Sequence, residues 1–277
     1  MILLHVAAAI LYALSAWALW PQGAAEQATA KSAPHSSAPS PILSAMWLLP
    51  AALVLHAWLA WSDVATPDGL DLSLANAVSV VGGLVAAVAL LSGLLRTLPA
   101  IGTIVLPVAA LAILLPVVFA HPHDYAFADK PLAAAHVAVA LVSYALFLVA
   151  AVQALILMGL EKRLHRRLPD PGRDSLPPLL TLERFLFRLV TAGFALLTLT
   201  LVSGMLFAEQ VFGRAIPFTH KTVFSVLGWL TFGALLWGRW RYGWRGRVAL
   251  RWIIAGTVFV FLAYLGSKFV LEVLLGR

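Results

Sequence analysis

The chain contains no cysteine. This absence excludes disulfide bonds, thiolate metal sites and iron–sulfur clusters. It also excludes covalent attachment of a cofactor through thioether bonds, and dithiol redox chemistry by this chain itself. Histidine, carboxylate and backbone groups are the ligands that remain for a metal.

Charged residues are also scarce. They make up 11% of the chain, against about 25% in a typical soluble domain, whereas 62% of the residues are hydrophobic. Lipid can solvate so much apolar surface, and no large soluble core is then needed. The composition predicts a single integral membrane domain over residues 1–277.

Long apolar stretches recur along the chain, each with the roughly 20 residues that a membrane span needs. They predict an all-α, polytopic bundle of about eight transmembrane helices. The first stretch opens with Met1-Ile2-Leu3-Leu4, which carries no positive charge, so we expect it to be retained and not cleaved as a signal peptide. Pro107 and Pro116 predict kinks in the fourth span. The eight stretches are 1–20, 42–61, 72–95, 98–119, 132–160, 182–208, 217–237 and 248–273.

The cationic residues lie mostly on one side of this arrangement. That side carries 14 of the 19 lysine and arginine residues, including a run in 161–181 and another in 239–251. Cation-rich loops stay in the cytoplasm. We therefore expect a multi-pass protein of the bacterial inner (plasma) membrane with both termini on the outer (periplasmic) side. Segment 21–41 is predicted to be a flexible cytoplasmic loop and 161–181 a basic one. The net charge of +7 reflects membrane orientation and lipid contact, with no nucleic acid as a partner.

Four histidines lie near the predicted outer ends of four different spans: His5, His56, His136 and His220. At about 1.5 Å per residue, each lies roughly 5 to 8 Å below the outer interface. A single histidine there often caps a helix or bonds to a headgroup. Ionisable groups in lipid are costly, however, and four at one level indicate a site.

Haem is the ligand that such a layer suggests. Low-spin haem takes two axial ligands, and neutral imidazole is a common one. No span carries two histidines at the spacing of a zinc-binding His-Glu-x-x-His motif. The prediction is a non-covalent, b-type haem held by these histidines. Lys221 and Arg214 are placed to pair with its propionates.

Several segments resemble the cytochrome c assembly family of membrane haem-handling proteins, the CcsA/CcmC-like proteins. One is the stretch 131–167, with His136-Val137 opening a span. Another is the sixth span, with Gly193-Phe194 and Ser203-Gly204. The closer likeness is to the HemX/YpjD-like branch of inner-membrane proteins. It is carried by His220-Lys221-Thr222-Val223, the Arg- and Trp-rich run 238–246, and Gly266-Ser267-Lys268-Phe269.

The resemblance implies an eight-helix bundle that carries or presents haem at the outer face for cytochrome c maturation. Other maturation proteins would be its partners. His136 matches the histidine that opens a span before the family's haem-presenting region. The resemblance thus ranks His136 and His220 first as iron ligands, with His5 and His56 as a second pair or as supports. Segment 209–218 departs from the family, since it lacks the tryptophan-rich stretch with a Trp-Asp pair. The expectation is therefore haem holding or handling, not delivery.

Other functions stay open at this stage. A regulatory or scaffold subunit, for tetrapyrrole synthesis or another membrane complex, would need no haem. A small-solute transporter is a third reading, although no inverted repeat or pair of broken helices supports it. The sequence contains no nucleophile motif, phosphate loop or paired carboxylates, so no enzymatic activity is expected.

Overall fold

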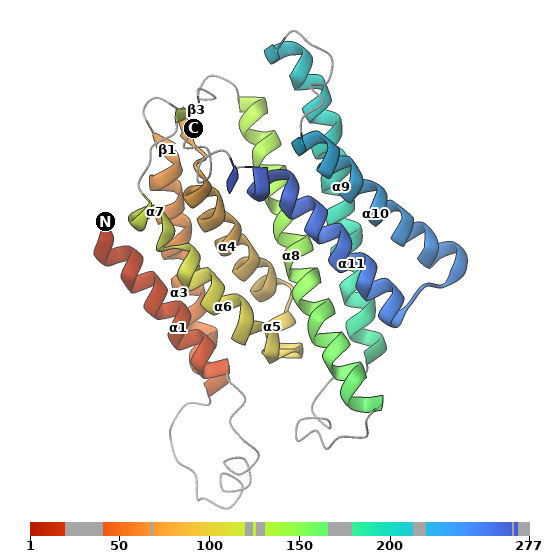
Figure 1. Cartoon of the computed structure of the whole chain (residues 1–277). Coiled ribbons are helices and arrows are strands. Elements are labelled where there is room, and N and C mark those ends of the chain that lie inside the picture. The colour runs from red at the N-terminus through yellow and green to blue at the C-terminus, as the bar shows by residue number, and fades with distance from the viewer. Residues whose placement is uncertain are drawn as a thin grey trace, which may run out of the picture.

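A computed structural model describes residues 1–19, 41–66, 69–119, 124–125, 131–165, 179–212, 220–267 and 269–270. Most of the predicted loop at 21–41 and much of that at 161–181 lie outside these ranges. Figure 1 shows the helices of the chain packed side by side in a bundle.

The predicted all-α membrane bundle is confirmed. Among the described residues, seven helices are long and apolar enough to cross a membrane. They are α1 (Ile2–Leu19), α3 (Pro41–Val64), α4 (Leu74–Leu91), α8 (Pro131–His165), α9 (Leu179–Phe212), α10 (His220–Tyr242) and α11 (Gly246–Phe261), which continues into the π-helical turn η3 (Leu262–Gly266).

The fourth predicted span is shorter and interrupted. It consists of α6 (Gly102–Ala112) and α7 (Leu115–Val118), after the short turns α5 (Leu94–Thr97) and η1 (Pro99–Ile101). α6 continues through Pro107, so the chain does not break there. The break falls at residues 113–114, directly before Pro116 in the first turn of α7. A proline is tolerated at that position, because the first turn of a helix needs no N–H donor from it.

Eight of the helices that the structure describes form two groups of four. α1, α3, α4 and α6 pack together, and α8, α9, α10 and α11 form the second group. α4 packs against α8 and joins the two groups, with α8 near the middle of the bundle (Figure 1).

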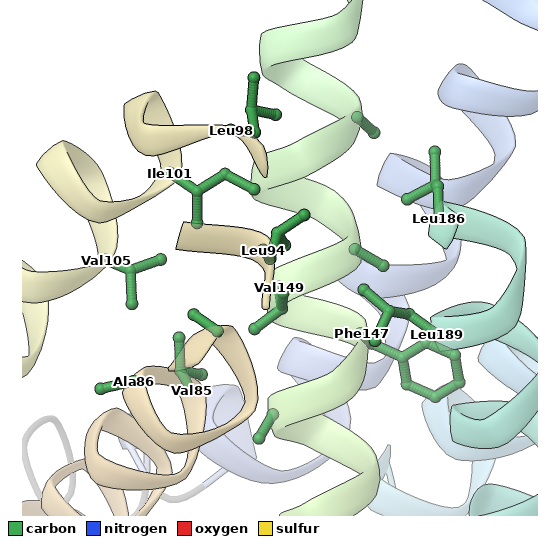
Figure 2. Close-up of a cluster of buried hydrophobic side chains, with 14 of the residues drawn as sticks. Val85, Ala86, Leu94, Leu98, Ile101, Val105, Phe147, Val149, Leu186 and Leu189 are labelled. Atoms are coloured by element: carbon green, nitrogen blue, oxygen red, sulfur yellow. The ribbon is translucent and has the colours of Figure 1, made fainter. Parts of the chain in front are cut away.

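α8 contributes to the core of both groups. Figure 2 shows Val149 directed toward Leu94 of α5, which lies between α4 and α6 in the chain, whereas Phe147 is directed toward Leu189 on α9. Residues two apart on a helix lie on nearly opposite faces, because successive residues are rotated by about 100°. Both side chains are fully buried.

A stacked pair of phenylalanines lies at the centre of the second group. The rings of Phe147 and Phe232 have centroids 3.9 Å apart and an interplanar angle of 9°. Glycines flank the stack on both sides. A Cβ atom at Gly193 would lie 2.9 Å from Phe147, and one at Gly256 would lie 2.8 Å from Phe232. α8, α9, α10 and α11 therefore pack closely here, because each contributes either one ring of the stack or one glycine beside it.

We expect Gly256→Ala to destabilise the protein by about 1–3 kcal/mol, the usual cost of overpacking a core. The added methyl group would press on Phe232, which cannot move away because Phe147 lies against its other face. Thermal unfolding in detergent measures the effect. Gly159→Ala is the matched control, because a Cβ there meets no atom within 4 Å. Equal stability of the two variants would contradict close packing at Gly256.

A small antiparallel sheet lies where α3 ends. Its order is β1 (Ala65–Thr66), β2 (Gly69–Asp71), β3 (Asp124–Tyr125). Leu70 of β2 pairs with Ala65 on one side and Tyr125 on the other. The Asn76 amide on α4 donates to the carbonyl oxygens of Asp63 and Asp71, both at 3.2 Å. This side chain ties the sheet to the end of α3.

Candidate histidine sites

His5 lies in the first part of α1 and is buried, with 2% of its surface exposed. Its Nδ1 donates to the Met1 carbonyl oxygen at 3.1 Å. Its Nε2 lies 2.9 Å from Oδ2 of Asp63, near the end of α3. Both ring nitrogens therefore have protein partners, and the ring joins α1 to α3.

His56 on α3 is equally buried, at 1% exposed. Its Nδ1 lies 3.0 Å from the Tyr12 hydroxyl on α1, and its Nε2 lies 3.1 Å from the Ser79 hydroxyl on α4. The ring rests against Gly83, where a Cβ would lie 3.1–3.3 Å from three ring atoms. One imidazole thus links three helices.

The predicted common depth does not hold for these two histidines. α1 and α3 are antiparallel, with His5 level with Asp63 and Tyr12 level with His56. The second contact lies seven residues further along both helices, which is about 10 Å deeper. Part of this error in the sequence-based depth arises because α3 continues to Val64, three residues or about 4.5 Å beyond the predicted end at residue 61.

His136 lies near the start of α8 and is half-buried. Its Nδ1 lies 2.8 Å from the Ser203 hydroxyl on α9. The ring is seated against the next residue of α9, Gly204. A Cβ there would lie 3.2 Å from His136 Cε1 and 3.9 Å from Nε2. α9 therefore offers this imidazole a hydroxyl group at Ser203 and, at the next residue, a glycine whose missing side chain leaves room for the ring.

The first turn of α10 approaches the same ring. The Lys221 ammonium lies close enough to His136 to interact with it electrostatically. It also lies 5.2 Å from the ring centroid of Tyr264, which stacks on Tyr144 at 5.9 Å between centroids. His220 is the first residue of α10 and is exposed. Arg214, the other predicted propionate partner, lies outside the described residues.

Basic residues cluster at the opposite end of these helices. Arg239 on α10 forms an ion pair with Glu183 on α9 at 3.5 Å, and Arg247 on α11 with Glu161 on α8 at 3.7 Å. The Arg239 guanidinium also lies 3.4 Å above the ring centroid of Phe187. The end of α8 that carries His136 and the cation-rich end are therefore a full helix length apart.

The four histidines differ in how well they fit a haem. Haem iron needs only one or two protein ligands, because the porphyrin supplies four nitrogens. The part of the chain that the structure describes contains no cluster of three or more His, Cys, Asp or Glu side chains that could hold a bare metal ion. His136 fits an axial ligand: its ring is half-buried, borders a glycine and lies near a cation. His5 and His56 fit less well, since each would have to give up a buried hydrogen bond.

The fold and these contacts define a class: an integral membrane helical bundle with an imidazole held at the end opposite its cation-rich loops. The chain belongs to the cytochrome C assembly protein family, whose model matches residues 40–275. The matched region contains His56, His136 and His220, and it leaves His5 outside.

Individual relatives match shorter stretches. Inner membrane protein YpjD of Escherichia coli K12 is 34% identical over 139 residues, 50% of this chain and 52% of that protein. An uncharacterized 28.8 kDa protein of Azospirillum brasilense is 38% identical over 141 residues, 51% of this chain and 52% of that protein. Cytochrome c biogenesis protein CcsA of Gloeobacter violaceus is 32% identical over 92 residues, 33% and 27% of the two chains. The matches to the first two span about half the length of each relative. No solved structure matches the chain.

The predicted family and the multi-pass membrane character are thus confirmed, and membership supports a role in cytochrome c biogenesis. The name of the first relative agrees with the predicted inner-membrane location. Sequence reasoning did not find the partners Tyr12, Asp63 and Ser79. Ser203-Gly204 entered it only as a segment of family likeness, and nothing in a single sequence pairs it with His136.

Proposed function

We propose that this inner-membrane protein binds a b-type haem non-covalently near the outer face and holds or handles it in cytochrome c biogenesis. The observation that carries the proposal is the half-buried His136 ring, fixed by Ser203 and bordered by Gly204 and Lys221. The proposed role is binding, without chemical conversion of the haem. Other maturation proteins are the proposed partners.

Each residue has a distinct part in this proposal. His136 would be the first residue to hold the iron, and His220 is the candidate for a second ligand. His220 is exposed in the same turn of α10 as Lys221, whose ammonium interacts with His136. Lys221 would pair with a propionate through a charge-assisted hydrogen bond. Bound haem would supply an iron centre that accepts or releases an electron.

His5 and His56 act as supports in this proposal. Both rings are buried and bonded at both nitrogens, to partners on other helices or at Met1, directly before α1. They hold α1, α3 and α4 together and leave iron ligation to the second helix group.

The direct test is an optical spectrum of the protein purified in nanodiscs after expression with ample haem. We expect a Soret band and a pyridine haemochrome spectrum of the b type. Addition of haem to the purified, folded apoprotein should restore the same band. No Soret band under either condition would overturn the proposal.

A regulatory or scaffold subunit remains the alternative. It is favoured by segment 209–218, which has no tryptophan and no aspartate where the assembly proteins carry both. A cell-based assay of cytochrome c content separates the two functions. The scaffold role predicts that a folded His136→Ala chain complements a deletion strain as well as the wild type does. Haem holding predicts that it does not.

A further inference from the structure

The hydroxyl group of Ser203 has three neighbours. Its Oγ lies 2.8 Å from Nδ1 of His136, 2.7 Å from the carbonyl oxygen of Leu199 and 3.2 Å from that of Thr200. A serine hydroxyl has one hydrogen to donate and two lone pairs to accept with. Carbonyl oxygens only accept, so the hydrogen of Ser203 is directed toward the backbone of its own helix. The Ser203 oxygen must then accept from His136.

This assignment settles which nitrogen of His136 carries the hydrogen. Nδ1 is the donor to Ser203, so in the neutral ring Nε2 carries the lone pair. Iron binds the nitrogen that has no hydrogen, and a hydrogen bond at the other nitrogen both fixes the ring and raises its basicity. We infer that Ser203 is a positioning residue that fixes His136 in the Nδ1–H tautomer and assigns Nε2 as the iron-binding atom. This inference rests on the proposed function.

Gly204 restrains the same ring from a second direction. A Cβ at this position would lie 3.2 Å from Cε1, the atom between the two ring nitrogens. A side chain there would push the imidazole away from α9 and lengthen the bond to Ser203. The serine hydroxyl and the glycine are consecutive residues of one helix, so the orientation of the ring is set by the rigid backbone of α9.

The tautomer can be measured without haem. In the haem-free protein labelled with ¹⁵N-histidine, in mildly alkaline buffer, NMR should report His136 protonated at Nδ1. Ser203→Ala should shift the ring toward the Nε2–H tautomer, and Ser203→Thr, which keeps the hydroxyl, should restore the wild-type signal. Thr191→Ala is the control, because the Thr191 hydroxyl also bonds back to its own helix, at the Phe187 carbonyl. An unchanged tautomer in Ser203→Ala would overturn the inference.

Haem titration supplies the second measurement. Partners of a metal-ligating histidine typically contribute 10–100-fold in metal affinity. We expect Ser203→Ala to lower haem affinity by about 10-fold, with Ser203→Thr and Thr191→Ala near the wild type and all variants equally folded by circular dichroism. If the wild type binds haem and Ser203→Ala binds it equally well, the role of Ser203 is overturned while the proposed function stands. If the wild type binds no haem, the proposed function fails, and the NMR measurement still decides whether Ser203 fixes the ring.

Discussion

A chain that carries His136→Ala is expected to fold normally and to lose most of its haem. Removal of the half-buried ring does not strand the Ser203 hydroxyl, because that group keeps its hydrogen bond to the Leu199 carbonyl. A haem iron held as proposed would, in contrast, lose a ligand outright. We expect haem affinity to fall by more than about 100-fold, the upper end of the effect of changing a ligand's partner. Titration of the folded apoprotein, followed at the Soret band, measures the loss.

A chemical rescue and one further variant sharpen this prediction. Free imidazole should enter the space left beside Gly204 in His136→Ala and restore part of the Soret band. His220→Ala should keep the haem but change the iron from six-coordinate, low-spin to five-coordinate, high-spin, since it removes the second ligand only. A His136→Ala chain that binds haem as tightly as the wild type would show that another residue holds the iron.

The second prediction concerns the buried histidine of the first helix group. His56→Leu is expected to lower the stability of the protein by about 1–3 kcal/mol, because it leaves the Tyr12 hydroxyl buried without its partner. Tyr12 is fully buried. Ser79 is on a helix and can turn its hydroxyl to its own backbone, so it adds little to the cost. Unfolding in a denaturing detergent, followed by circular dichroism, gives the measurement.

A double variant separates the lost hydrogen bond from a change in packing. Tyr12→Phe removes the stranded hydroxyl, and replacing both partners of a bond with apolar groups is close to neutral. We therefore expect Tyr12→Phe/His56→Leu to be more stable than His56→Leu alone. The folded fraction of His56→Leu should still bind haem with wild-type affinity. Loss of haem from well-folded His56→Leu would instead assign His56 to the haem site.

Hydropathy was enough to predict the helices but not their ends. Seven of the eight predicted spans are long apolar helices, because about 20 apolar residues are a strong signal. The end of α3 lies three residues beyond the predicted one, and that difference contributes to the misplaced depth of His56. The small sheet was not predicted, since strands of two or three residues show no periodicity. Pro116 marked the break in the fourth span, whereas Pro107 lies within an unbroken α6.

The sequence was enough to select the candidate histidines and the lysine, but not to identify the residues that contact them. A histidine in an apolar span stands out in any sequence, and so does a lysine beside it. The register between two helices decides whether His136 meets Ser203, and hydropathy carries no information about that register. The same holds for Tyr12 and Ser79, which are ordinary polar residues of α1 and α4 until His56 is placed between them.

α8 and α9 contain 35 and 34 residues, so each is about 50 Å long at about 1.5 Å per residue. The hydrocarbon core of a bilayer is only about 30 Å thick. Glu161, paired with Arg247, belongs at or beyond one edge of that core, because charges in lipid are costly. His136 lies about 37 Å from Glu161 along the axis of α8. With Glu161 at one edge of the core, we therefore expect the His136 imidazole near the opposite edge, at the end of α8 where the helix leaves the hydrocarbon.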